Sequence, residues 1–164
     1  MKATGVIRRI DDLGRIVIPK EIRKNLKINE GDSLEIYVDD SNVIFKKYSI
    51  LDNMISFSTK LADSFYKVYN QGIIITDNDK IIATSKNMIT YLSKELASNI
   101  KDKISSRKEI SELGVITLDL ETKYYISPII VNSDAIGSII ILDDVVDKKT
   151  IDLLNTIFIK ELEE

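Results

Sequence analysis

The chain contains no cysteine, no histidine and no tryptophan among its 164 residues. Without cysteine and histidine it cannot form disulfides or the usual zinc sites, and it has no histidine for acid–base catalysis. Its six glycines are scattered singly, so a glycine-rich phosphate loop is also missing. These absences exclude the commonest catalytic sites, and we expect neither enzymatic activity, a cofactor nor a bound metal ion.

Long hydrophobic runs are missing as well. The apolar runs are short, as at Ile139 to Leu142, and fall far below the roughly 20 residues that cross a bilayer. The start of the sequence shows no apolar stretch of the kind that follows the charges of a secretory signal. With 44% hydrophobic and 30% charged residues, the composition is typical of a folded protein, and we expect a cytoplasmic one without membrane contact.

The net charge of −3 is unevenly distributed along the chain. Residues 1–50 hold ten Lys or Arg against eight acids, whereas residues 51–164 hold thirteen against eighteen. Within residues 1–24 the ratio is seven to three. A positive end on an acidic protein indicates a polyanionic partner confined to that end, although composition alone fits a merely solvated charged surface equally well.

The first 50 residues predict a small β-rich domain, in which strands alternate with turns and Pro19 opens a short helix. Proline fits the first position of a helix because its missing N–H costs nothing there. In chain order we expect a strand at Val6 and Ile7, a turn at 11–14, a strand at 15–18, a helix at 20–26, a turn at 29–32, and a hairpin of strands 34–38 and 43–45. A domain this small is marginal unless metals, disulfides or partner chains help. We therefore expect residues 1–50 to dimerise.

An amphipathic helix is predicted for residues 51–70. The apolar residues that recur there at helical spacing are Leu51, Met54, Leu61, Phe65 and Val68. The apolar face is broad enough to meet more than one neighbour. Two interpretations remain open: the helix packs on its own domain, or it is a connector that also pairs between subunits.

The remaining residues, 71–164, predict an antiparallel sheet flanked by helices. The expected elements are a hairpin of strands 72–76 and 80–84, a helix at 87–107, three strands at 113–120, 124–131 and 136–142, and a helix at 147–162. Pro128 indicates an edge position or a bulge in its strand, since proline cannot donate to a β-ladder. The sequence thus predicts an α+β protein with domains 1–50 and 71–164 joined by helix 51–70.

A cluster of basic residues is the strongest chemical signal in the sequence. The planar guanidinium of arginine donates two parallel hydrogen bonds, which suits phosphate groups and guanine bases. A two-fold dimer would double the cluster into one continuous surface. Ordinary charge for solubility is the alternative interpretation. The residues of the cluster are Lys2, Arg8, Arg9, Arg15, Lys20, Arg23 and Lys24.

Two further motifs have structural explanations. Gly31-Asp32-Ser33-Leu34 spells the signature of a family of lipases and esterases, but that family needs a downstream histidine, and here the four residues fit a turn entering a strand. Asp143, Asp144 and Asp147 could hold a divalent cation. We favour the interpretation that they cap a helix, because acidic residues at a helix start interact favourably with the helix dipole.

Several segments of residues 1–50 resemble the AbrB-type swapped-hairpin DNA-binding domain. They are Met1 to Gly5, Arg8-Arg9, Asp11 to Arg23, Glu30-Gly31-Asp32 and Leu34-Glu35-Ile36. Over its full length, including Phe45 to Ser49, the chain is similar to sporulation regulators in which an AbrB-type domain precedes a GAF-like domain.

The resemblance implies an interlocked β-barrel dimer that docks on A/T-rich double-stranded DNA through Arg8, Arg15, Arg23 and Lys24, with Arg9 and Lys2 assisting. Position 24 is arginine in close relatives, and lysine there keeps the charge but loses the forked donor. The resemblance further implies activation and repression of genes in the forespore. It also implies a tetramer joined through helices 51–70 and 147–162. The GAF-like domain would either bind an unidentified small molecule or only oligomerise.

Two other classes of function remain as alternatives. Antitoxins share the AbrB-type barrel and neutralise a toxin through a disordered tail, whereas the tail here is patterned as a folded domain. A stand-alone metabolite-binding or enzymatic GAF-like protein would leave the basic N-terminus unexplained.

Overall fold

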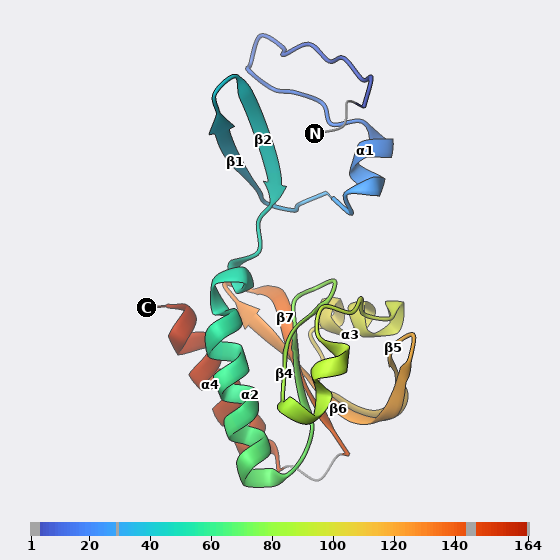
Figure 1. Ribbon diagram of the computed structural model, residues 1–164, viewed down its shortest axis with the longest axis vertical. Helices are drawn as coiled ribbons and strands as arrows, with labels where there is room; N and C mark the ends of the chain where they lie inside the picture. Colours follow the sequence, from blue (N-terminus) through green and yellow to red (C-terminus); the bar gives the residue numbers. More distant parts are fainter. Residues whose placement is uncertain (1–3, 29, 144–146, 164) are drawn as a thin grey trace. The chain divides into compact units, whose positions relative to one another are not determined.

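The computed structural model describes residues 4–28, 30–143 and 147–163. The chain divides into two compact units, Met1–Tyr48 and Ser49–Glu164 (Figure 1). The fold is α+β, and the second unit is built around a five-stranded antiparallel sheet. No helix in the described ranges is long and apolar enough to cross a membrane.

The first unit contains helix α1 (Lys20–Asn25) and the hairpin of β1 (Leu34–Asp39) and β2 (Asn42–Lys47). The two strands pair antiparallel from Leu34 opposite Lys47 to Asp39 opposite Asn42. These three elements confirm the helix and the hairpin that the sequence predicts. Gly31 has a φ of +88° in the turn before β1, which supports the structural explanation of the lipase-like motif.

The two strands expected before α1 are not formed. Residues 4–19, all of which the structure describes, contain no regular strand. The backbone bonds within this stretch close only the turn between Asp11 and Arg15. An extended segment becomes a strand when a neighbour supplies its hydrogen bonds, and β1 and β2 pair only with each other.

The sheet of the second unit has the strand order β4-β3-β7-β6-β5, with every neighbouring pair antiparallel. Interior strands β3 and β7 carry continuous runs of buried residues, because helices cover both of their faces. The strands are β3 (Ile73–Thr76), β4 (Ile81–Thr84), β5 (Ile110–Thr117), β6 (Leu120–Val131) and β7 (Asp134–Leu142).

Alternate residues of the strands supply two separate hydrophobic cores, one on each face of the sheet. Ile73 and Ile75 face the core beneath α2 (Ile55–Tyr69) and α4 (Lys148–Leu162). Ile74 faces the core beneath α3 (Ser98–Ser106). The second unit is therefore a three-layer sandwich: the sheet is flanked by helices as predicted, but α2, from the segment 51–70, shares one layer with α4 (Figure 1).

Helix α2 packs within the second unit and lies antiparallel to α4. Near one end, the Tyr69 and Thr150 hydroxyls are hydrogen-bonded at 3.0 Å. Near the other, the Phe57 and Phe158 rings meet edge to face, with centroids 5.9 Å apart. A short 3₁₀ helix, η1 (Ile50–Met54), precedes α2 and buries Leu51 in the same core.

The prediction of one continuous helix at 87–107 is wrong. The structure has a 3₁₀ helix, η2 (Lys86–Tyr91), and then α3, which begins only at Ser98. Between them the chain runs along the edge of the sheet, where Leu96 N–H donates to the Asp79 carbonyl at 2.8 Å. The sheet edge thus supplies the hydrogen bonds that a continuous helix would have made internally.

The structure confirms the capping interpretation for Asp147 and the edge position for Pro128. The side chain of Asp147 accepts a hydrogen bond from Thr150 N–H at 3.1 Å and caps α4; Asp144 lies outside the described residues. For Pro128, the β5 ladder ends at Ile126, so the proline lies on a strand segment that is an edge on that side.

Candidate nucleic-acid interface

The described members of the basic cluster all lie in the first unit and are exposed to solvent. They occupy three local structures: the extended segment before the turn, the end of the turn, and α1. Lys2 lies outside the described residues. The other members are Arg8, Arg9, Arg15, Lys20, Arg23 and Lys24.

Helix α1 presents three cations on one face. Lys20, Arg23 and Lys24 stand three and four positions apart, the spacing that aligns side chains on a helix. Pro19 occupies the N-cap position with a φ of −58°, close to the value that its ring enforces. Arg23 and Lys24 lie in the last turn, where the helix dipole favours positive charge. Local sequence thus directs this basic face outward.

Arg15 is held at the end of a tight turn by the carboxylate of Asp11. Asp11 Oδ1 accepts hydrogen bonds from the backbone N–H groups of Leu13 at 3.0 Å and Arg15 at 2.7 Å. Oδ2 accepts from Arg15 Nε at 2.7 Å. Gly14, with a φ of +75°, donates to the Asp11 carbonyl at 3.0 Å. One side chain therefore orders both the turn and the arginine that follows it.

The sequence by itself predicts only a turn at residues 11–14 and does not reveal the contact between Asp11 and Arg15. An available signal was the aspartate at the first turn position, since Asp side chains often bond backbone N–H groups two residues on. The contact with the guanidinium depends on a side-chain conformation that composition does not reveal.

The Asp11 pKa gives a direct test of this turn. The backbone N–H of Arg15, and then its side chain, hold the Asp11 pKa below its ordinary value of 3.8. A depressed carboxyl pKa means that the ordered turn persists above 3.8 and is lost as pH falls through the lower, folded value. We expect the amide shifts of Leu13 and Arg15 to titrate together, with a midpoint below 3.8, in an NMR pH series.

Asp11→Asn is the control for this titration, because the amide cannot ionise and both shifts should then stay flat through the same range. A midpoint at or above 3.8 in the wild-type protein would contradict the turn geometry.

The first unit has an apolar surface beside its basic residues. None of its described residues is buried. Ile7 is 87% exposed and Val17 is 72% exposed. Two extended segments, residues 6–8 and 16–19, line a groove of about 430 Å³. Ile22 of α1 and Phe45 of β2 also line this groove, and Arg8 borders it. Isolated domains rarely leave this much apolar surface uncovered.

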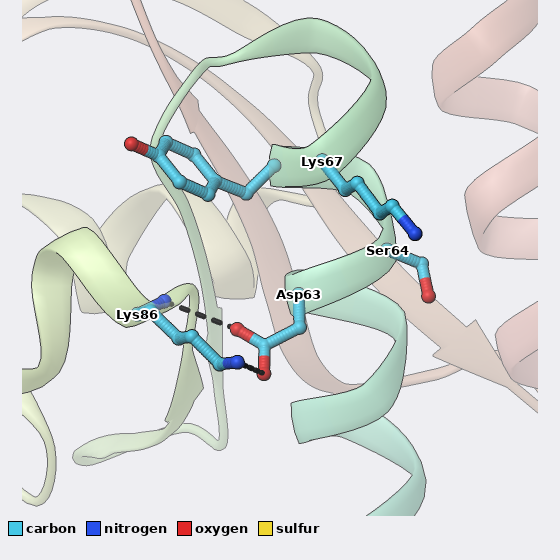
Figure 2. Close-up of a pocket in the computed structure, with 5 residues that line it drawn as sticks. Asp63, Ser64, Lys67 and Lys86 are labelled. Carbon is cyan, nitrogen blue, oxygen red and sulfur yellow. Dashed lines mark hydrogen bonds and ion pairs between the residues drawn. The ribbon is translucent and has the colours of Figure 1, made fainter.

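A cavity of about 350 Å³ in the second unit does not form a convergent ligand site. Asp63 of α2 accepts a hydrogen bond from the backbone N–H of Lys86 at 3.1 Å, and its carboxylate lies 4.0 Å from Lys86 Nζ. Ser64 and Lys67 extend away from this pair (Figure 2). Asp63 therefore ties α2 to the start of η2, and the polar groups around it face different directions.

Two family models match consecutive parts of the chain. The model described as "Stage V sporulation protein T C-terminal, transcription factor" matches residues 53–158. The model described as "Antidote-toxin recognition MazE, bacterial antitoxin" matches residues 7–49. The first match falls within the second unit, and the second covers the turn, α1 and the hairpin.

Comparison with individual proteins extends this likeness. Stage V sporulation protein T of Bacillus subtilis (strain 168) is 41% identical over 150 residues, which cover 86% of this chain and 84% of that protein. Transition state regulatory protein AbrB of the same organism is 40% identical over 95 residues, covering 56% of this chain and 97% of that protein. A solution structure of the N-terminal DNA recognition domain of AbrB is 59% identical and covers 30% of this chain and 92% of its own, with a TM-score of 0.26.

Proposed function

This chain belongs to the family of stage V sporulation protein T, a family of transcription factors and not of enzymes, and from that membership we propose that it regulates sporulation genes by binding double-stranded DNA through its first unit. The observation that carries the proposal is the exposed basic cluster of residues 8–24. The DNA recognition domain of AbrB, which is 59% identical over 30% of this chain, supports it. In finer detail, it activates some forespore genes and represses others.

The chemistry of the cluster supports binding to many related sequences. Within the described residues, no salt bridge engages Lys20, Arg23 or Lys24, so their charges are available to phosphates. Phosphate contacts position a protein on DNA, while local DNA shape and deformability add selectivity. We propose that A/T-rich promoter DNA is the preferred target, with Arg8, Arg9, Arg15, Lys2 and Lys20 completing the contact surface.

The exposed apolar surface of the first unit supports an interlocked dimer. A partner chain would cover Ile7 and Val17 and supply strand neighbours for the two extended segments. Apolar residues also remain exposed on α2 and α4, the two helices that cover one face of the sheet, at Val68 and Leu153. We propose that these helices join two dimers into a tetramer, and that the second unit is a GAF-like domain that either only oligomerises or also binds a small molecule that biases the spacing of the paired DNA-binding units.

Fluorescence anisotropy across a salt series tests DNA binding. We expect the wild-type protein to bind an A/T-rich duplex with a logarithmic affinity that falls linearly with log salt, because each phosphate contact contributes about −0.9 to the slope. Arg15→Ala should weaken binding by about tenfold and make the slope shallower by about one contact for each subunit on the duplex.

Lys149→Ala, which removes the same charge from an exposed position of the second unit, is the matched control and should change neither value. If the wild-type protein fails to bind at low salt, the proposed function is wrong. If both variants behave alike, the cluster is not the contact surface.

An antitoxin-like function is the second candidate, favoured by the antitoxin family model over residues 7–49. Antitoxins of this kind neutralise a partner through a disordered tail. The second unit instead has two buried cores around a five-stranded sheet, and this observation favours the transcription regulator.

A further inference from the structure

We propose that Asp11 is a positioning residue for DNA discrimination: it holds the Arg15 side chain through Nε and presents the two terminal amino groups of the guanidinium as a fixed fork. This inference rests on the proposed function, because it requires that Arg15 contacts DNA. It adds that an acidic residue beside the contact surface improves the choice between DNA sequences while lowering overall attraction to DNA.

The division of contacts between the two Asp11 oxygens carries the proposal. Oδ1 accepts the backbone N–H groups of Leu13 and Arg15, whereas Oδ2 accepts Arg15 Nε at 2.7 Å. In the described part of the chain no hydrogen bond occupies the terminal amino groups of Arg15. Those two groups are the ones that form parallel hydrogen bonds to phosphate or to a guanine edge.

The solvent exposure of Asp11 and Arg15 indicates that their contact restricts the motion of the Arg15 side chain more than it stabilises the fold. The Arg15 side chain is 70% exposed and that of Asp11 is 37% exposed. Exposed ion pairs of this kind contribute little to folding. An arginine that is already ordered loses less side-chain entropy on binding, which favours the DNA geometry that matches its fixed position.

The negative charge of Asp11 weakens binding to DNA of any sequence. A carboxylate next to the contact surface repels phosphates and cancels part of the Arg15 charge. Removing this carboxylate should therefore raise affinity for any duplex and lower preference for the matching one. A role limited to holding the turn together would instead lower both affinities.

Asp11→Asn and Asp12→Asn separate these effects in the full-length protein. Asn at position 11 can still accept backbone hydrogen bonds through its carbonyl oxygen, but its amino group cannot accept from Arg15 Nε. Asp12 is exposed and carries the same charge, and no hydrogen bond or ion pair engages its side chain in the described part of the chain. Asp12→Asn thus removes one adjacent charge without changing how Arg15 is held.

Competition anisotropy with an A/T-rich promoter duplex and a G/C-rich duplex of equal length measures the preference. We expect Asp12→Asn to raise both affinities by a similar factor and leave their ratio unchanged. Asp11→Asn should lower the ratio about fivefold, the cost of ordering one arginine side chain. Exchange of the Arg15 Nε proton, followed by NMR, should become faster in Asp11→Asn alone.

The outcomes distinguish this inference from the proposed function. If the wild-type protein binds neither duplex, the proposed function fails and Asp11 positions nothing for DNA. If it binds both duplexes equally well, or if the two variants give the same ratio, DNA binding stands and the role of Asp11 is overturned. A lower ratio with unchanged Nε exchange also overturns it.

Discussion

Replacing Gly137 with alanine is expected to destabilise the second unit by about 3 kcal/mol, near the upper end of the usual cost of overpacking. Gly137 lies on β7, where a Cβ would stand 2.0 Å from the Thr76 carbonyl oxygen of β3 and 2.9 Å from a Leu51 methyl group. The carbonyl belongs to the backbone of a buried strand and cannot rotate away. Strands β3 and β7 would have to separate at the centre of the sheet.

Thermal unfolding followed by circular dichroism measures this effect, and we expect the transition of the second unit to fall by roughly 10 °C. Gly114→Ala is the matched control. At Gly114 the nearest atom to a new Cβ is Glu112 Oε1 at 3.2 Å, so a shift of a few tenths of an ångström would accommodate it, whereas the 2.0 Å approach at Gly137 requires far more. An equal loss of stability in both variants would show that the close approach of β7 to β3 is not what requires glycine at position 137.

Ile7→Asp is expected to reduce the mass of the assembly by at least half and to abolish promoter binding. Ile7 is 87% exposed on the single chain and lines the apolar groove of the first unit. If a partner chain covers that groove, the substitution buries one unpaired charge in each of two symmetric positions. A total cost of about 3 kcal/mol or more corresponds to a loss of at least about 100-fold in dimer affinity.

Leu118→Asp is the matched control for this substitution. Leu118 is 100% exposed between β5 and β6 of the second unit, so the same change from an apolar to an acidic side chain should leave both the mass and DNA binding intact. Sedimentation equilibrium provides the mass, and anisotropy provides the affinity. A wild-type mass for Ile7→Asp would rule out the groove as the dimer contact.

Local sequence was sufficient where an element obtains its hydrogen bonds from its own neighbours. Helix α1 begins after Pro19, whose φ of −58° suits a helix start. Helix α4 begins after Asp147, whose side chain caps it. The β1–β2 hairpin reverses at Asp40, which has a φ of +46°, and its alternating pattern predicted the pairing. The exposed basic face of α1 follows from spacing within a single helix.

Long-range contacts decided the remaining elements, because helix and strand compete for the same backbone groups. The apolar spacing of residues 87–107 is equally compatible with one helix, but Leu96 donates to Asp79 at the sheet edge and the helix is interrupted. The β-branched residues around Val17 have strand propensity, yet they form no strand, because within the described residues no other strand pairs with them. The hold of Asp11 on Arg15 likewise required a conformation that brings Oδ2 to Nε. Composition and periodicity thus identify which residues can form a strand, a hydrophobic core or a basic surface. The hydrogen-bond partner of each backbone or side-chain group depends on the folded chain.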